Sequence, residues 1–69
     1  MDRQVVITEF ERCDNYDFGT IGDNYLDTTI SKYVKKYFPK EKILAQKGNI
    51  IILKDRCYGA FYPEQLTHS

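Results

Sequence analysis

The sequence predicts an α+β fold: one small domain over residues 1–69, with a mostly antiparallel four-stranded sheet and one helix packed on one face. Three observations predict it. Residues 24–38 have the apolar spacing of a helix, the flanking segments are rich in β-branched and aromatic residues, and short turn signals separate the last three of these segments. The expected order of elements is β-α-β-β-β.

The length and composition limit what such a domain can do. The chain has 69 residues, of which 42% are hydrophobic and 29% charged, as in ordinary globular proteins. A domain this short buries only about 60% of its unfolded surface. We therefore expect no deep, water-excluding pocket, and we expect the protein to act through its outer surface or by association.

The first strand is expected over Gln4–Phe10, where β-branched and aromatic residues dominate. The chain then becomes polar from Glu11 to Asp23, with the Asp, Asn and Gly residues that favour turns. This segment is predicted to be a loop.

The helix is expected between Asn24 and Phe38. Its apolar positions fall on one face of a 3.6-residue period: Leu26, Ile30, Tyr33, Val34, Tyr37 and Phe38. Asp23 or Asp27 is expected to cap its start. Pro39 disfavours helical geometry at the preceding residue and should end the helix there.

Three strands are expected over residues 42–47, 50–54 and 57–62. Gly48-Asn49 is a strong two-residue hairpin signal, and Asp55-Arg56 is a weaker one. The result is an antiparallel meander. The tail after Pro63 is too short to predict an element, although Leu66 is expected to fold back onto the domain.

Two-residue turns sort the side chains of these strands onto two faces. In this register Ala45 faces Ile52 and Gly59, and Leu44 faces Leu53 and Tyr58. The first face is dry and includes small residues: Ile43, Ala45, Ile50, Ile52, Cys57, Gly59 and Phe61. The second carries Leu44, Gln46, Ile51, Leu53, Tyr58, Ala60 and Tyr62. Because small side chains permit close approach, we expect the helix on the first face.

The strand at 50–54 is expected to be internal, because its Ile-Ile-Ile-Leu run lacks the polar alternation of a half-exposed strand. One helix covers only one face of it. The second face is expected to be covered in one of two ways. Either the 11–23 loop folds over it with Tyr16, Phe18 and Ile21, or another molecule does, namely a second copy of the chain or a partner protein.

The leading functional hypothesis is a non-enzymatic module that regulates or inhibits a larger protein by stoichiometric binding. Phages and mobile elements encode small α+β proteins that bind and modulate a larger host enzyme. This chain is analogous to them in size and composition only. The binding surface is an exposed edge strand or the tyrosine-bearing second face. On that face the candidate partner-binding residues are Leu44, Gln46, Ile51, Leu53, Tyr58 and Tyr62.

The alternative hypothesis is nucleic-acid binding by the Lys- and Tyr-rich region 32–58. Its candidate residues are Lys32, Lys35, Lys36, Lys40 and Arg56. The stretch from Arg56 to Phe61 partly resembles the RNA-recognition signature, but Cys57 stands where that signature has glycine. The net charge of zero also counts against this alternative.

Charge is unevenly distributed along the chain. Residues 1–31 carry seven acidic and two basic side chains, whereas residues 32–69 carry eight basic and three acidic ones. Such polarity can steer a charged partner, and a fold that brings the halves together would partly cancel it.

No catalytic, cofactor or metal site is expected, because the single histidine, His68, stands next to last and no nucleophile has a positioned base. The sequence has no membrane-spanning run and no signal-like N-terminus, so we expect a cytoplasmic protein without membrane association. In that compartment Cys13 and Cys57 are expected to be reduced thiols, with a disulfide between them as the alternative.

Overall fold

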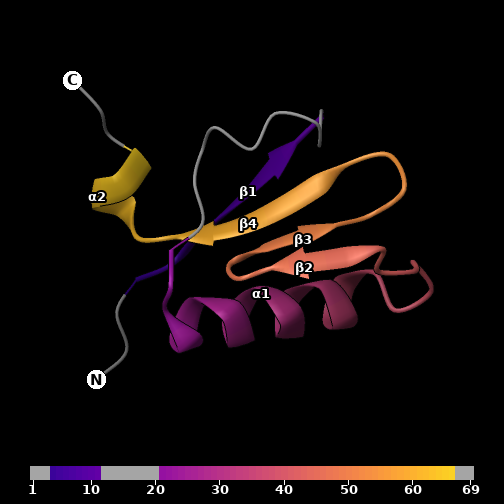
Figure 1. The fold of residues 1–69 in the computed structure, drawn as a ribbon, viewed down its shortest axis with the longest axis horizontal. Coiled ribbons are helices and arrows are strands. Elements are labelled where there is room, and N and C mark those ends of the chain that lie inside the picture. The colour runs from indigo at the N-terminus through magenta and orange to yellow at the C-terminus, as the bar shows by residue number, and fades with distance from the viewer. Residues whose placement is uncertain (1–3, 12–20, 67–69) are drawn as a thin grey trace.

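The computed structural model describes residues 4–11 and 21–66 of the chain. The described residues form four strands and two helices (Figure 1). Their bounds are β1 Val6–Phe10, α1 Asn24–Tyr37, β2 Ala45–Lys47, β3 Ile50–Ile52, β4 Cys57–Phe61 and α2 Pro63–Leu66. The predicted α+β class and the order β-α-β-β-β are confirmed, with the four-residue helix α2 as an addition.

Both ends of α1 follow the sequence signals. Asp23 is the N-cap, and its Oδ1 accepts a hydrogen bond from the Tyr25 N–H at 2.8 Å. At the other end the Phe38 N–H donates to the Val34 carbonyl, and Pro39 follows at once. Of the two predicted capping residues, Asp23 is therefore the one that caps.

The sheet has the strand order β1-β4-β3-β2, and every neighbouring pair is antiparallel. The prediction that the Ile-rich strand is internal is confirmed, because β3 lies between β2 and β4. β1 pairs with the last strand, which the sequence did not specify. The two edges of the sheet are β1 and β2 (Figure 1).

The β2–β3 turn has the predicted position. Gly48 has a positive φ of 58°, and no non-glycine residue among those described has one. Positive φ at the first central residue alone is the pattern of a type II′ turn, which suits the twist of a hairpin. Ala45 accordingly pairs with Ile52, as predicted.

The β3–β4 turn lies one residue earlier than predicted. The Leu53 N–H donates to the Arg56 carbonyl at 2.8 Å, so Lys54 and Asp55 form the turn. Tyr58 therefore pairs with Ile51 rather than with Leu53. The register shifts by two residues, and a shift of two leaves every side chain on its predicted face.

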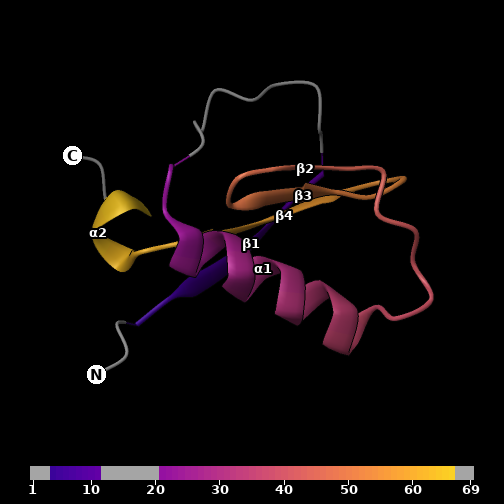
Figure 2. The same cartoon turned by 60° about the horizontal axis from the view of Figure 1, so that its bottom comes forward.

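Helix α1 packs on the opposite face from the one predicted. Its buried residues Leu26, Ile30 and Val34 lie against the tyrosine-bearing face. Figure 2 shows α1 on one side of the sheet. The sheet residues of this core are Ile51, Leu53, Tyr58, Ala60 and Tyr62.

The error comes from Gly59. We expected this glycine to admit the helix, but a Cβ atom there would lie 2.6 Å from Phe61 Cε2 and 3.3 Å from Phe10 Cε2. Aromatic rings from the sheet itself fill the space above Gly59. Phe10 and Phe61 meet edge to face with their centroids 6.1 Å apart.

A second, smaller core occupies the face away from α1. Ile50, Cys57 and Phe61 are buried there, with Phe10 and Ile21 packed against them. β3 is therefore buried on both faces, as predicted. Ile21 contacts both cores, whereas Tyr16 and Phe18, the other residues expected to cover a face, lie outside the described residues.

Candidate functional site

Four of the six candidate partner-binding residues lie in the core beneath α1. Ile51, Leu53, Tyr58 and Tyr62 are all buried. In this fold they do not form a surface that a partner could contact, because the helix already occupies their face. The tyrosine-bearing face is therefore part of the core and is not a docking surface in this fold.

The two remaining candidates, Leu44 and Gln46, lie at the exposed edge of the sheet. Leu44 directly precedes β2 and is 57% exposed. All three residues of β2 are exposed. The other binding surface that we considered, an exposed edge strand, is thus present at β2.

Hydrogen bonds to β4 determine which main-chain groups of β3 point toward it. The Asn49 carbonyl accepts from the Ala60 N–H at 3.0 Å, and the Leu53 N–H donates to the Arg56 carbonyl. In an antiparallel ladder successive residues alternate between the two neighbouring strands. The main-chain N–H and C=O groups of the odd-numbered residues of β3 therefore point toward β4, and those of the even-numbered residues point toward β2.

The same alternation applies one strand further out. Ile52 faces β2 and pairs with Ala45, so Ala45 turns its main chain toward β3. The Leu44 N–H also donates to the Ile52 carbonyl at 2.9 Å, which interrupts the alternation just before β2 begins. Since Ala45 turns its main chain toward β3, the next residue must turn its own away. The main-chain N–H and C=O of Gln46 therefore point outward from the sheet edge.

A polar groove of about 390 Å³ lies between β2 and the outer side of α1. Its lining residues carry hydroxyl, amide or charged groups: Asp27, Thr28, Ser31, Lys32, Lys35 and Gln46. The five helix residues form one stripe because residues three and four apart share a helix face. That spacing is visible in the sequence, but only the position of β2 shows that the stripe borders a groove.

Gln46 connects the two walls of the groove. Its side-chain Nε2 donates to the Asp27 carbonyl at 3.2 Å and to the Gly48 carbonyl at 3.1 Å. The side chain thus holds β2 against the N-terminal half of α1. Asp27, another residue of the lining, has its Oδ1 buried with no hydrogen-bond partner among the described residues, so the desolvation of this acceptor is uncompensated there.

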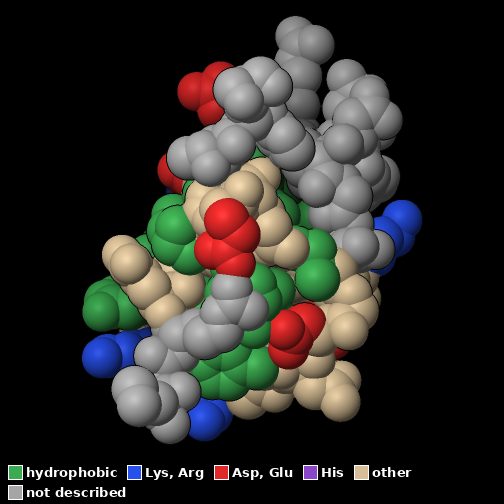
Figure 3. Space-filling model, turned by 90° about the vertical axis from the view of Figure 1, so that its left-hand side faces the viewer, with side chains coloured by type: hydrophobic (Ala, Val, Ile, Leu, Met, Phe, Trp, Pro, Cys, Tyr) green, Lys and Arg blue, Asp and Glu red, His purple; other side chains and the backbone are tan. Residues whose placement is uncertain are grey.

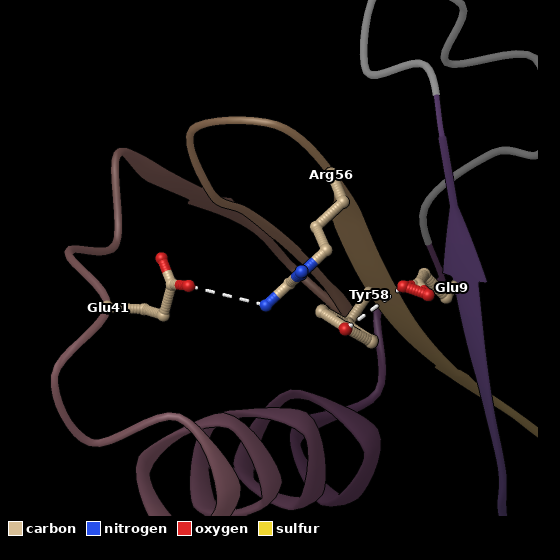
Figure 4. A network of polar contacts seen from close by, with 4 residues as sticks. All are labelled: Glu9, Glu41, Arg56 and Tyr58. Carbon is tan, nitrogen blue, oxygen red and sulfur yellow. Dashed lines mark hydrogen bonds and ion pairs between the residues drawn. The ribbon is translucent and has the colours of Figure 1, made fainter.

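Of the candidate nucleic-acid-binding residues, Lys32 and Lys35 line the groove, and the others lie elsewhere. Lys36 has its Nζ 5.3 Å from the centroid of the Tyr37 ring. Lys40 is exposed beyond the end of α1. Arg56, at the β3–β4 turn, takes part in a separate network (Figure 4).

The Arg56 network lies over the aromatic part of the core. The Arg56 guanidinium lies 4.9 Å from the centroid of the Phe38 ring, and its Nη2 is 3.3 Å from Glu41 Oε1. Figure 4 shows Arg56 between Glu41 and Tyr58, with Glu9 beyond the tyrosine. The charge of Arg56 is therefore engaged within the protein.

Tyr58 is the titratable group whose environment stands out. Its hydroxyl donates to Glu9 Oε2 at 3.2 Å. Burial raises the pKa of Tyr58, and the hydrogen bond and negative charge of Glu9 raise it further, whereas the nearby positive charge of Arg56 lowers it. Because Tyr58 is buried, this shift reflects packing of the core and does not mark a reactive site.

The end of the molecule where α1 begins and α2 lies has a different character. Hydrophobic side chains are in view there beside acidic ones (Figure 3). Tyr25 near the start of α1 and Leu66 at the end of α2 are each 42% exposed. Leu66 is thus only partly folded back onto the domain.

Cys57 is buried and disulfide-bonded. The expectation of a reduced thiol is therefore wrong for this residue, and Cys13 lies outside the described residues. Within the described ranges, no group of three or more His, Cys, Asp or Glu side chains is placed to hold a metal ion. Neither α1 nor α2 is long and apolar enough to cross a bilayer.

Comparisons of the chain with protein-family models, with curated proteins and with solved structures found no match. The groove and the sheet edge beside it are therefore the features of this molecule that point to a function.

Proposed function

We propose that this protein is a non-enzymatic binding module that takes up an extended segment of a partner protein as an additional strand beside β2. The observation that carries the proposal is the position of Gln46, whose main-chain N–H and C=O point outward from an exposed edge strand. Edge strands of this kind bind extended peptides through main-chain hydrogen bonds.

The groove supplies the second part of a binding site. A strand added beside β2 would lie along the outer side of α1, so alternate side chains of the segment would point into the groove. Main-chain pairing gives affinity that depends little on sequence, and contacts of alternate side chains give specificity. The site therefore suits a chosen partner segment rather than any extended peptide.

The biological role that we propose is regulation or inhibition of a larger protein by stoichiometric binding. β2 is only three residues long, so the contact it offers is small. Small interfaces are typical of transient, regulatory encounters.

Nucleic-acid binding has less support. The two lysines of the groove share it with Asp27, whose charge repels phosphate, and Arg56 is held by Glu41. A polyanion would also make no use of the outward main-chain groups of Gln46.

The proposal is tested with a displayed library of random eight-residue peptides, selected on the folded protein. We expect enrichment of peptides that bind the wild type with 1:1 stoichiometry by calorimetry. Gln46→Pro should abolish this binding, because proline removes the outward N–H while leaving both ladder partners of β3 intact.

Gln46→Ala is the matched control, since it removes the same side chain and keeps the N–H. It loses a side chain of the groove lining but should still bind the enriched peptides measurably, whereas Gln46→Pro should not. Circular dichroism should show that both variants are folded. Enrichment that is equal on Gln46→Pro and wild type, or no enrichment at all, would overturn strand addition at β2.

A further inference from the structure

We infer that the partner segment carries acidic side chains at alternate positions on the side that faces α1. This inference rests on the proposed function, because it describes what binds at β2. The observation behind it is the placement of Lys32 and Lys35, both of which line the groove beside the sheet edge.

The spacing of the two lysines fits a strand. They are three residues apart in α1, which places their backbones about 4.5 Å apart along the helix axis. Residues i and i+2 of a strand lie on the same side, about 6.6 Å apart. The flexible four-carbon stem of lysine covers this difference, so one carboxylate can face each ammonium group.

Asp27 gives the groove a direction. It lies eight residues before Lys35 in α1, which corresponds to about 12 Å along the helix axis. The groove is thus negative at the end near the helix N-terminus and positive toward its C-terminal half. The acidic residues of the segment should lie at the positive end, and a run of acidic residues along the whole groove would meet repulsion from Asp27.

The same charges disfavour a second copy of the chain as the occupant. A second copy paired through β2 would turn the side chains of its own Leu44 and Gln46 toward α1, and neither carries a negative charge to pair with Lys32 or Lys35. A different protein with acidic side chains fits the groove better.

The experiment measures the affinity of labelled eight-residue peptides by fluorescence anisotropy at low ionic strength. The probes alternate Thr-Glu, Thr-Gln or Thr-Lys, and a fourth has four Thr followed by four Glu. We expect Thr-Glu to bind roughly three- to thirtyfold more tightly than Thr-Gln, from two exposed ion pairs. Thr-Lys should bind weakest, and the block peptide, whose Glu residues can lie at the lysine end away from Asp27, should bind at least as tightly as Thr-Glu.

Charge reversal supplies the internal controls. In the double variant Lys32→Glu/Lys35→Glu the preference should invert in favour of Thr-Lys. The matched variant Lys36→Glu/Lys40→Glu changes two lysines outside the groove and should keep the preference for Thr-Glu. Thr-Gln binding as tightly as Thr-Glu, or a preference that survives reversal of Lys32 and Lys35, would overturn the inference.

The experiments distinguish failure of strand addition at β2 from failure of the preference for acidic side chains. If Gln46→Pro abolishes binding of every peptide and charge has no effect, strand addition stands and acidic selection is wrong. If Thr-Glu binds Gln46→Pro as well as wild type, strand addition itself is wrong. A single-stranded oligothymidylate that displaces Thr-Glu more effectively than unlabelled Thr-Glu would overturn both in favour of nucleic-acid binding.

Discussion

Asn49 shows how one residue can serve a turn and the core at once. Its side-chain Nδ2 donates to the Ala60 carbonyl at 2.9 Å, and its Oδ1 accepts from the Ile21 N–H at the same distance. It is completely buried. Asn49 therefore joins the β2–β3 turn both to β4 and to the chain that leads into α1.

We predict that Asn49→Ala lowers the free energy of unfolding by about 2–3 kcal/mol, because it leaves main-chain groups of Ile21 and Ala60 without their partner. Urea denaturation monitored by circular dichroism measures the loss. Gln46→Ala is the control: it also removes two side-chain hydrogen bonds to main-chain groups, here two carbonyls, but these bonds are exposed. Equal losses in the two variants would contradict the role of burial.

The raised pKa of Tyr58 predicts that the free energy of unfolding falls at alkaline pH. Its pKa is raised above the ordinary value of 10.0, chiefly by burial and then by Glu9. The folded protein thus keeps the phenolic proton at pH values where the unfolded chain has released it. This contribution to stability is fully present below about pH 10 and is lost as the pH rises through the folded pKa.

Urea denaturation of wild type and Tyr58→Phe at pH 8 and at pH 11 checks this prediction. The wild type should lose more stability between the two values than Tyr58→Phe does. Tyr37→Phe removes an exposed hydroxyl and should keep the wild-type loss. An unchanged loss in Tyr58→Phe would show that other groups cause the alkaline destabilisation.

At the scale of elements, Asp23 joins the start of α1 to the end of the sheet. One carboxylate oxygen caps the helix, and the other accepts from the Tyr62 hydroxyl at 2.6 Å. Tyr62 directly follows β4 and precedes α2, whose Gln65 side chain accepts from the Tyr62 N–H at 3.0 Å. Three elements thus meet at this pair of residues.

We predict that Asp23 and Tyr62 are energetically coupled. In a double-mutant cycle of Asp23→Ala and Tyr62→Phe, the coupling free energy should be about 1–3 kcal/mol, because the hydrogen bond involves a charged acceptor. Chemical denaturation of the four proteins measures it. Additive losses, with no coupling, would show that the contact does not stabilise the junction.

The β3–β4 hairpin shows where element prediction reaches its limit. The Asp55-Arg56 signal was displaced by one residue, and the actual turn at Lys54 and Asp55 leaves Arg56 free to lie over the Phe38 ring. Turn propensity is a local preference, and tertiary contacts such as this one compete with it. The side chains nevertheless lie on their predicted faces, because the register moved by an even number of residues.

At the scale of the whole molecule, the disulfide at Cys57 contributes a covalent constraint in the second core, beneath Phe61 and Ile50. A domain of this size has a small core, so such a crosslink matters to its stability. It also bears on the expected cytoplasmic location, since lasting disulfides are typical of oxidising compartments.

We predict that a reducing agent lowers the free energy of unfolding by about 2–4 kcal/mol. Denaturation with and without dithiothreitol measures the effect, and mass spectrometry of the unreduced digest should link the Cys57 peptide to the peptide that carries Cys13. Cys57→Ala is less stable from the outset and should not respond to the reductant. If the wild type does not respond either, the bond does not stabilise the fold.

The sequence by itself determined the class, the order of elements, the ends of α1 and the two-sided burial of β3. These properties follow from local patterns: the helical spacing from Leu26 to Val34, the Asp23 and Pro39 boundaries, and the unbroken apolar run at 50–53. Periodicity shows that a face is buried and leaves open which element buries it.

The tertiary structure decided which face of the sheet α1 covers, and with it the location of the candidate site. Small residues on the first face suggested room for a helix, but the rings of Phe10 and Phe61 fill the space over Gly59. Tyr58 and Tyr62 are therefore core residues, and the groove lies between β2 and the polar stripe of α1. Competition between rings and helix for one space depends on contacts distant in sequence, which no local pattern records.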